Sequence, residues 1–236
     1  MSLSELAGHI PVFGSVINAL AILLGTGVGL VFRSAIPQRI NTAAFHVIGL
    51  FTLWLGTSTA GSTHNILILV VSLVLGTVAG ELLDLDSQFR RGTQFLQQKI
   101  GTSGPFGEGF MAGTLLFCMG SMAILGSLEE GLGQWPKLLL TKSLMDGIAS
   151  AAFAVSLGVG VALSAASVLL YQGAITLAAG VLAPYMSQPV TDEISAVGGV
   201  MLMGLALGIL EIKQIKVMNM LPGLAVAALL ASLFSF

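Results

Sequence analysis

Unbroken runs of apolar residues fill most of the chain and are separated by short polar segments. A helix crosses the hydrocarbon core of a membrane in about 20 residues, and several runs come close to that length. The runs lack the alternation of barrel strands, and backbone groups in lipid must pair within their own segment, which favours helices. The sequence therefore predicts an all-α, polytopic membrane protein with about eight transmembrane helices, at residues 11–32, 42–60, 65–83, 109–126, 143–163, 166–185, 194–210 and 217–236.

A polar connector at residues 84–108 has a pattern of its own. Leu85, Phe89, Leu96 and Ile100 recur near helical spacing, and basic residues are interleaved with them. This pattern predicts a short amphipathic helix on the cytoplasmic leaflet. An ordinary solvated connector is the alternative interpretation.

Composition agrees with a membrane location and excludes several classes of protein. Charged residues make up 8% of the 236 residues, whereas a soluble domain carries about 25%. The mean hydropathy of +0.96 is too high for a cytosolic enzyme, a disordered chain or a secreted disulfide scaffold. The formal net charge of -2, without a basic stripe, excludes a nucleic-acid partner. The single cysteine, Cys118, allows neither an internal disulfide nor a C-x-x-C metal site.

Basic residues are distributed unevenly between the predicted loops. Residues 1–10 contain no Lys or Arg, so we expect no cleaved signal peptide and interpret the first apolar run as a retained span. If the N-terminus lies outside, most basic residues fall in cytoplasmic loops, as the positive-inside rule requires, and both termini are outside. The cytoplasmic set is Arg33, Arg39, Arg90, Arg91, Lys99, Lys213 and Lys216, against Lys137 and Lys142 outside.

Glycines and a weak repeat suggest how the spans assemble. Small residues four apart allow close helix packing in lipid, or mark helices that unwind at a substrate site. The segment Ile17–Gly29 resembles Ile148–Gly160, which suggests duplication of a four-helix unit in one membrane domain (1–236), with parallel halves at 11–126 and 143–236. We also expect a homodimer through the glycine faces. The glycine pairs are Gly25/Gly29, Gly76/Gly80, Gly109/Gly113 and Gly204/Gly208.

Polar residues at membrane depth are costly, so each is a candidate for function. In the fourth predicted span, Thr114, Cys118 and Ser121 fall at i, i+4 and i+7 and should share one face, with Gly120 beside them. Such a small, polar, glycine-interrupted segment is typical of a discontinuous transporter helix. A tightly packed central helix is the alternative.

Asp146 is the carboxylate that the sequence places inside a predicted span. Ser143, Asp146 and Ser150 lie on one helical face, so Asp146 couples to H⁺ or Na⁺, closes a capping box with Ser143 as N-cap, or does both. Tyr171-Gln172 and Asn18 add donors and acceptors at membrane depth. Those three side chains either contact a solute or bond to a neighbouring helix.

Several segments together resemble the bacterial membrane proteins of the domain of unknown function 554 family, the YdfK/YqgA-like proteins. The resemblance covers nearly the whole chain and implies a polytopic fold in the bacterial inner (plasma) membrane, with no assigned site. The chain departs from the family pattern at Gly208, where an Asn is expected, and at Glu211, where a small residue is usual. The segments that carry the resemblance are Gly14–Ala19, Glu108–Phe110, Phe117–Gly131, Lys142–Ser150, Leu170–Gly173 and Ala196–Gly199.

These observations favour a secondary transporter or permease for a small polar or charged solute, bound near the bilayer midplane with H⁺ or Na⁺ coupling through Asp146. The motifs H-E-x-x-H, G-x-S-x-G and Walker A are absent, so we expect neither an enzyme nor a cofactor or metal site. A channel or passive pore, and a non-transporting scaffold or sensor, are the alternatives. The expected solute-binding residues are Asn18, Thr114, Cys118, Gly120, Ser121, Asp146, Ser150, Tyr171 and Gln172.

Overall fold

A computed structural model describes residues 12–35, 38–101, 104–118 and 120–234. This part of the chain is helical and contains no strand, as the apolar runs predict. Residues 1–10, for which we expect no signal peptide, and the end of the last predicted span, 235–236, lie outside the described residues. The helices are α2 (Phe13–Ala35), α3 (Gln38–Ala60), α4 (Ile66–Leu83), α5 (Leu85–Ile100), α6 (Phe106–Cys118), α7 (Ser121–Gly131), α8 (Lys137–Leu157), α9 (Gly160–Leu177), α10 (Ala179–Leu182), η1 (Ala183–Tyr185), α11 (Gln188–Ile209), η2 (Val217–Met220) and α12 (Pro222–Phe234).

The chain is a multi-pass helical membrane protein. Within the described ranges, six helical segments are long and apolar enough to cross a membrane: α2, α4, α8, α9, α11 and the η2–α12 segment. The pair α6 and α7, bent by 59°, would make a seventh span. The predicted second span lies within α3, which is not one of the six. The helices thus support six or seven spans, and the predicted number of eight is not established.

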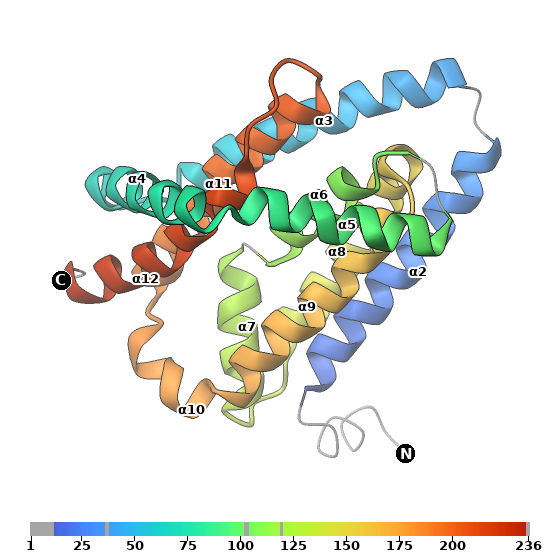
Figure 1. Cartoon of the computed structure of the whole chain (residues 1–236). Coiled ribbons are helices and arrows are strands. Elements are labelled where there is room, and N and C mark those ends of the chain that lie inside the picture. The colour runs from blue at the N-terminus through green and yellow to red at the C-terminus, as the bar shows by residue number, and fades with distance from the viewer. Residues whose placement is uncertain (1–11, 36–37, 102–103, 119, 235–236) are drawn as a thin grey trace, which may run out of the picture.

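The helices form two bundles that meet along a seam (Figure 1). In the first bundle α2 packs on α8 and α9, and α6 and α7 pack on α9 and α8. In the second bundle α3 packs along α11, and α4 packs along α12. The seam is formed where α8 meets α3 and where α6 and α7 meet α11. Each bundle contains helices from both predicted halves of the chain, and the duplication itself stays a prediction.

Glycine allows the closest helix contacts in both bundles. A Cβ atom added at Gly25 would lie 2.0 Å from the carbonyl oxygen of Gly147, so α2 and α8 touch through their backbones. The same distance separates a Cβ at Gly80 from the carbonyl oxygen of Asn219, where α4 meets η2. Gly204, in contrast, faces side chains of the loop after α11. Backbone contact of this kind is how helices associate in lipid, where the hydrophobic effect does not drive them together.

The predicted boundary between the fifth and sixth spans, near Ser164, is wrong. The turn falls at Gly158, which ends α8 with φ +77, a conformation that glycine adopts without strain. Ser164 lies inside α9, where its hydroxyl donates a hydrogen bond to the carbonyl oxygen of Val161 (2.6 Å). The chain turns at the residue whose backbone conformation requires a glycine. The small residues near Ser164 did not indicate the position of this turn.

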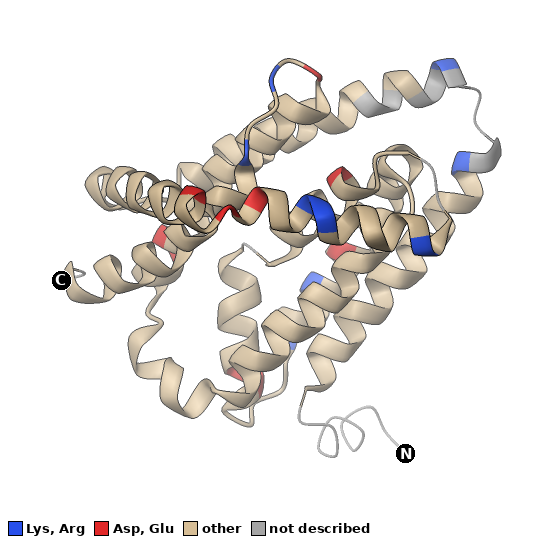
Figure 2. Ribbon diagram, viewed as in Figure 1, with Lys and Arg blue, Asp and Glu red and all other residues tan. Residues whose placement is uncertain are grey.

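The connector at 84–108 contains a helix, α5, which crosses the front of the molecule in Figure 1. Phe89 on α5 stacks on Phe110 of α6 (ring centroids 5.4 Å apart), and Asn219 accepts a hydrogen bond from the backbone N–H of Asp86 (2.7 Å). Basic residues occur on α5, on the loop after α11 and at the neighbouring ends of α2 and α3 (Figure 2). Residues 102–103 of the connector lie outside the described residues, and the position of α5 on the cytoplasmic leaflet stays a prediction.

Candidate functional site

A cluster of four buried polar side chains joins α2, α8 and α9 in the first bundle. The Lys142 ammonium lies 2.8 Å from both carboxylate oxygens of Asp146. The Asn18 amide nitrogen donates to Asp146 Oδ2 (3.0 Å) and to Gln172 Oε1 (3.3 Å). Asn18 and Gln172 are fully buried, and Asp146 and Lys142 are 5% and 7% exposed. Three of the nine predicted site residues therefore form one network, together with a lysine that the sequence analysis assigned to a loop.

The start of α8 places Asp146 deep in the helix. The helix begins at Lys137, directly after Trp135-Pro136, and Glu129 of α7 accepts a hydrogen bond from the Leu138 N–H (3.1 Å). At about 1.5 Å per residue, Asp146 lies roughly 13 Å along the helix. The predicted capping box is therefore wrong, because Ser143 is inside the helix and donates to the carbonyl oxygen of Leu139 (2.7 Å). Lys142 and Asp146 are instead one turn apart, the spacing at which opposite charges pair.

The network leaves two polar atoms without a partner in the described part of the chain. These are Asn18 Oδ1, an acceptor, and Gln172 Nε2, a donor. Buried polar atoms in proteins are nearly always hydrogen-bonded, to protein or to ordered water. The network therefore retains an open acceptor and an open donor for water or for a polar solute.

A hollow of about 300 Å³ lies beside Asp146, at the seam between the two bundles. We call it the polar hollow. A second hollow of about 630 Å³, the apolar hollow, adjoins it, and both are lined by Thr59, Gly120, Lys142, Met145 and Asp146. The polar hollow is lined in addition by Ser62, Ser121, Met122, Asp192 and Ser195, and the apolar hollow by Val47, Ile48, Phe51, Leu55, Leu116, Ile148, Ala149, Ala152, Phe153 and Leu202.

The break between α6 and α7 forms one wall of both hollows. Gly120 has an extended backbone (φ -117, ψ 147) and is the N-cap of α7, while residue 119 lies outside the described residues. Ser121 therefore begins a second helix, and the predicted shared face of Thr114, Cys118 and Ser121 is wrong. Gly120 and Ser121, which directly follow the break, both line the polar hollow.

The other predicted site residues serve packing in this structure. Thr114 hydrogen-bonds to Ser167 of α9 (3.1 Å), and Cys118 is buried in the hydrophobic core. The hydroxyl of Ser150 donates to the carbonyl oxygen of Ile22 (3.1 Å), linking α8 to α2. Tyr171 packs partly buried against the core. None of these four residues lines either hollow.

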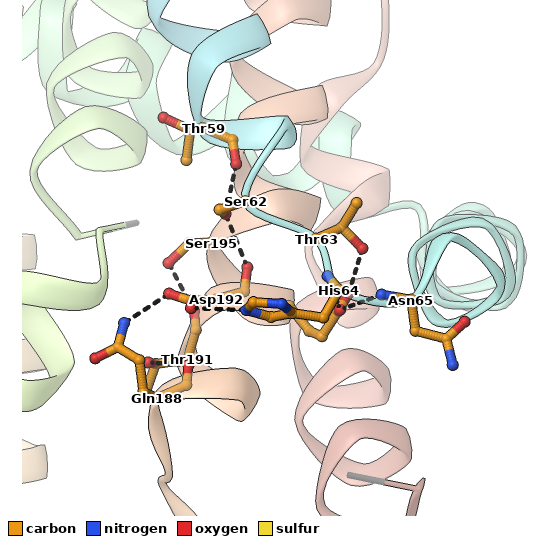
Figure 3. Close-up of polar contacts among 10 residues, drawn as sticks. Thr59, Ser62, Thr63, His64, Asn65, Gln188, Thr191, Asp192 and Ser195 are labelled. Carbon is orange, nitrogen blue, oxygen red and sulfur yellow. Dashed lines mark hydrogen bonds and ion pairs between the residues drawn. The ribbon is translucent and has the colours of Figure 1, made fainter. Parts of the chain in front are cut away.

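A second group of polar residues lies where the α3–α4 turn meets the start of α11 (Figure 3). The Asp192 carboxylate accepts a hydrogen bond from Gln188 Nε2 (2.7 Å) and lies 3.1 Å from His64 Nε2. The Ser62 hydroxyl lies 3.2 Å from the backbone oxygen of Asp192. Asp192, Ser62 and Ser195 also line the polar hollow, so this group and Asp146 border the same space.

Glu193, next to Asp192, has a different environment. Its carboxylate accepts hydrogen bonds from the backbone N–H groups of His64 (2.6 Å) and Asn65 (2.8 Å) and from the Thr63 hydroxyl (2.7 Å). The side chain is 2% exposed. A carboxylate at the start of α4 satisfies donors that have no partner inside the helix and complements its dipole. Glu193 therefore holds the second bundle together at the α3–α4 turn.

A family model described as "Protein of unknown function (DUF554)" matches residues 13–232. The chain belongs to the DUF554 family. It is 31% identical to "Uncharacterized membrane protein YdfK" of Bacillus subtilis (strain 168) over 218 residues, 91% of this chain and 93% of the relative. It is also 31% identical to "Uncharacterized protein YqgA" of Escherichia coli (strain K12) over 222 residues, 92% and 94% of the two chains. No solved structure shows a significant match.

Sequence reasoning missed several residues of the DUF554 chain that the structure brings to the site. The i, i+4 spacing of Lys142 and Asp146 was a usable signal for the buried ion pair. Asp192 and Glu193 gave no such signal, because adjacent carboxylates at the start of a helix are usually solvated. Their roles depend on contact with the α3–α4 turn, more than 120 residues away in sequence.

Proposed function

We propose that this protein is a secondary transporter for a small polar or charged solute, located in the bacterial inner membrane with both termini outside. The observation that carries the proposal is the polar hollow at the seam of the two bundles, beside the Lys142–Asp146 pair. Charged residues at membrane depth are rare and typically line substrate or ion pathways. A site between two bundles is also the place where rocking of one bundle against the other would change access.

Asp146 is the coupling residue in this proposal, and Lys142 is its counterion in the empty state. A proton or Na⁺ that neutralises the carboxylate would remove the attraction that holds the ammonium 2.8 Å away. Lys142 would then be free to turn into the polar hollow, which it already lines. Occupancy of Asp146 by a proton or Na⁺ would thus place a positive charge in the hollow and expel a cationic solute, as exchange of that solute for H⁺ or Na⁺ requires.

The alternatives make different demands on the same residues. A scaffold needs no space beside a buried ion pair, and the hollow therefore favours transport. A channel would conduct without a coupling residue, so single-channel currents that persist in an Asp146 variant would favour the channel. We also propose that the protein is not an enzyme, because the polar cluster contains no nucleophile–base pair.

The test is flux in proteoliposomes with the Asp146→Asn variant. Candidate solutes are screened with imposed H⁺ and Na⁺ gradients, using an internal pH dye and electrical recording from supported membranes. We expect gradient-driven flux in the native protein and a loss of at least about tenfold in Asp146→Asn, because the amide cannot exchange a proton or bind a cation by charge. Glu211→Gln, which changes an exposed carboxylate that lines neither hollow, is the matched control. Undiminished gradient-driven flux in Asp146→Asn would overturn the coupling role.

A further inference from the structure

We propose that the solute is an amphiphilic amine, with its ammonium group held by Asp192 in the polar hollow and its apolar body in the apolar hollow. This inference rests on the proposed function and names the class of solute. It is carried by three features of the hollows: their charge, the hydrogen-bonding capacity of their hydroxyls, and the apolar lining of the adjoining space.

The polar hollow carries an excess of negative charge. Its charged lining residues are Lys142, Asp146 and Asp192. The first two neutralise each other at 2.8 Å, whereas Asp192 is contacted by the Gln188 amide and the His64 imidazole. An ionised carboxylate offers about four lone-pair positions, so two hydrogen-bond partners leave it able to bind a cation. An anionic solute would meet the Asp192 carboxylate in the hollow.

The hydroxyls around Asp192 are arranged as acceptors. Ser195 donates its hydroxyl proton to the backbone oxygen of Thr191 (2.7 Å), and Ser62 donates to the backbone oxygen of Thr59 (2.7 Å) (Figure 3). Once that proton is used, a hydroxyl oxygen can only accept. Two hydroxyl acceptors beside a carboxylate suit an ammonium group, which has three donors and no acceptor, better than a carboxylate or a carbonyl group.

The apolar hollow provides the place for the rest of the molecule. It shares Thr59, Met145 and Asp146 with the polar hollow, and its remaining walls include Leu55, Leu116 and Phe153. Ligand sites of this kind combine a mainly apolar lining with a few polar groups that fix orientation. An amine with an alkyl or aryl body matches the pair of hollows, whereas a sugar or a small inorganic ion leaves the larger one unused.

The experiment measures binding and flux separately with the full-length, detergent-purified protein. Butyl-, hexyl- and octylammonium are titrated in a thermal-stability assay against hexanoate and hexanol, which share the chain but lack the cation. A ligand of the folded state raises stability with concentration. We expect the ammonium series to bind best, with affinity rising roughly fourfold or less for each added methylene. Asp192→Asn should weaken hexylammonium binding at least about tenfold, and Ser195→Ala should weaken it less. Glu211→Gln is the control.

The outcomes separate this inference from the proposed function. Hexanoate or hexanol binding as well as hexylammonium, or hexylammonium binding unchanged in Asp192→Asn, would overturn the amine assignment. If Asp192→Asn does not fold, the Ser195→Ala result and the ranking of the three hexyl compounds decide. Asp146-dependent flux of an acid or sugar would retain the transporter and reject the amine. Asp192-dependent amine binding without any flux would retain the site and reject transport.

Discussion

The two bundles each bury a carboxylate on a long helix, and the two carboxylates are satisfied in opposite ways. In the second bundle, Glu193 accepts two backbone N–H groups and one hydroxyl from the α3–α4 turn. In the first bundle, Asp146 is held by the side chains of Lys142 and Asn18. Backbone donors at a helix start are fixed by the fold, whereas an ammonium and an amide on flexible side chains can change partners.

The difference shows why burial of a charge does not by itself identify a functional site. Both carboxylates meet the requirement that a buried charge be paired. The α3–α4 turn supplies three hydrogen-bond donors to the Glu193 carboxylate, and two of them are backbone N–H groups held in place by the fold. Asp146 borders a hollow, and its network contains two open atoms, Asn18 Oδ1 and Gln172 Nε2. A carboxylate with mobile partners, open atoms and adjoining space is the better candidate for function.

The largest expected effect comes from removing Lys142. Lys142→Met leaves the buried Asp146 carboxylate without its counterion, with Asn18 as its remaining partner, and breaking a buried pair in this way costs about 3–5 kcal/mol of unfolding free energy. Replacing both partners, as in Lys142→Met with Asp146→Leu, should recover most of that loss, because no buried charge remains. Thermal and denaturant unfolding in detergent measure both variants. If Lys142→Met alone is as stable as the native protein, the ion pair with Lys142 does not stabilise the fold.

A smaller loss of stability is expected at Glu193, without a loss of function. Glu193→Gln keeps the shape but loses the charge and one of the acceptor oxygens, and hydrogen bonds to charged groups are worth about 1.5–3 kcal/mol. We expect a lower melting temperature with the solute affinity and the coupling of the remaining folded protein unchanged. The paired measurement is unfolding and flux in the same preparation. Loss of coupling at unchanged stability would reverse the roles that we assign to the two carboxylates.

Sequence patterns predicted the helical class and most span positions because each span must satisfy its own backbone and present apolar side chains to lipid. Two of the errors occur where the backbone conformation of a single glycine determines where a helix ends or begins. Gly158 ends α8 six residues before the predicted turn at Ser164, and Gly120 divides the fourth predicted span into two helices. A glycine in a glycine-rich chain gives no sign of which backbone conformation it adopts.

The candidate site was predicted in part, for reasons that can be stated residue by residue. Asn18, Asp146 and Gln172 were found because polar side chains at membrane depth are expensive. Ser150 and Thr114 have the same property but bond to Ile22 and Ser167 on neighbouring helices. Deciding between solute and helix partner requires the packing of α2, α8 and α9, which depends on contacts far apart in sequence.

The smallest effect is expected at an exposed ion pair, whose carboxylate, Glu81, provides a reference for the two buried carboxylates. Glu81 at the end of α4 lies 3.0 Å from Lys216, and both side chains are about half exposed. The hydrogen bond to Glu81 raises the pKa of Lys216, so any stabilisation by the pair is present at neutral pH and is lost as pH rises through the raised pKa. Exposed pairs contribute little because water screens them. Lys216→Met should therefore leave the melting temperature at pH 7 unchanged within error. A loss at pH 7 as large as that of Glu193→Gln would contradict this prediction and show that an exposed carboxylate can contribute as much stability as a buried one.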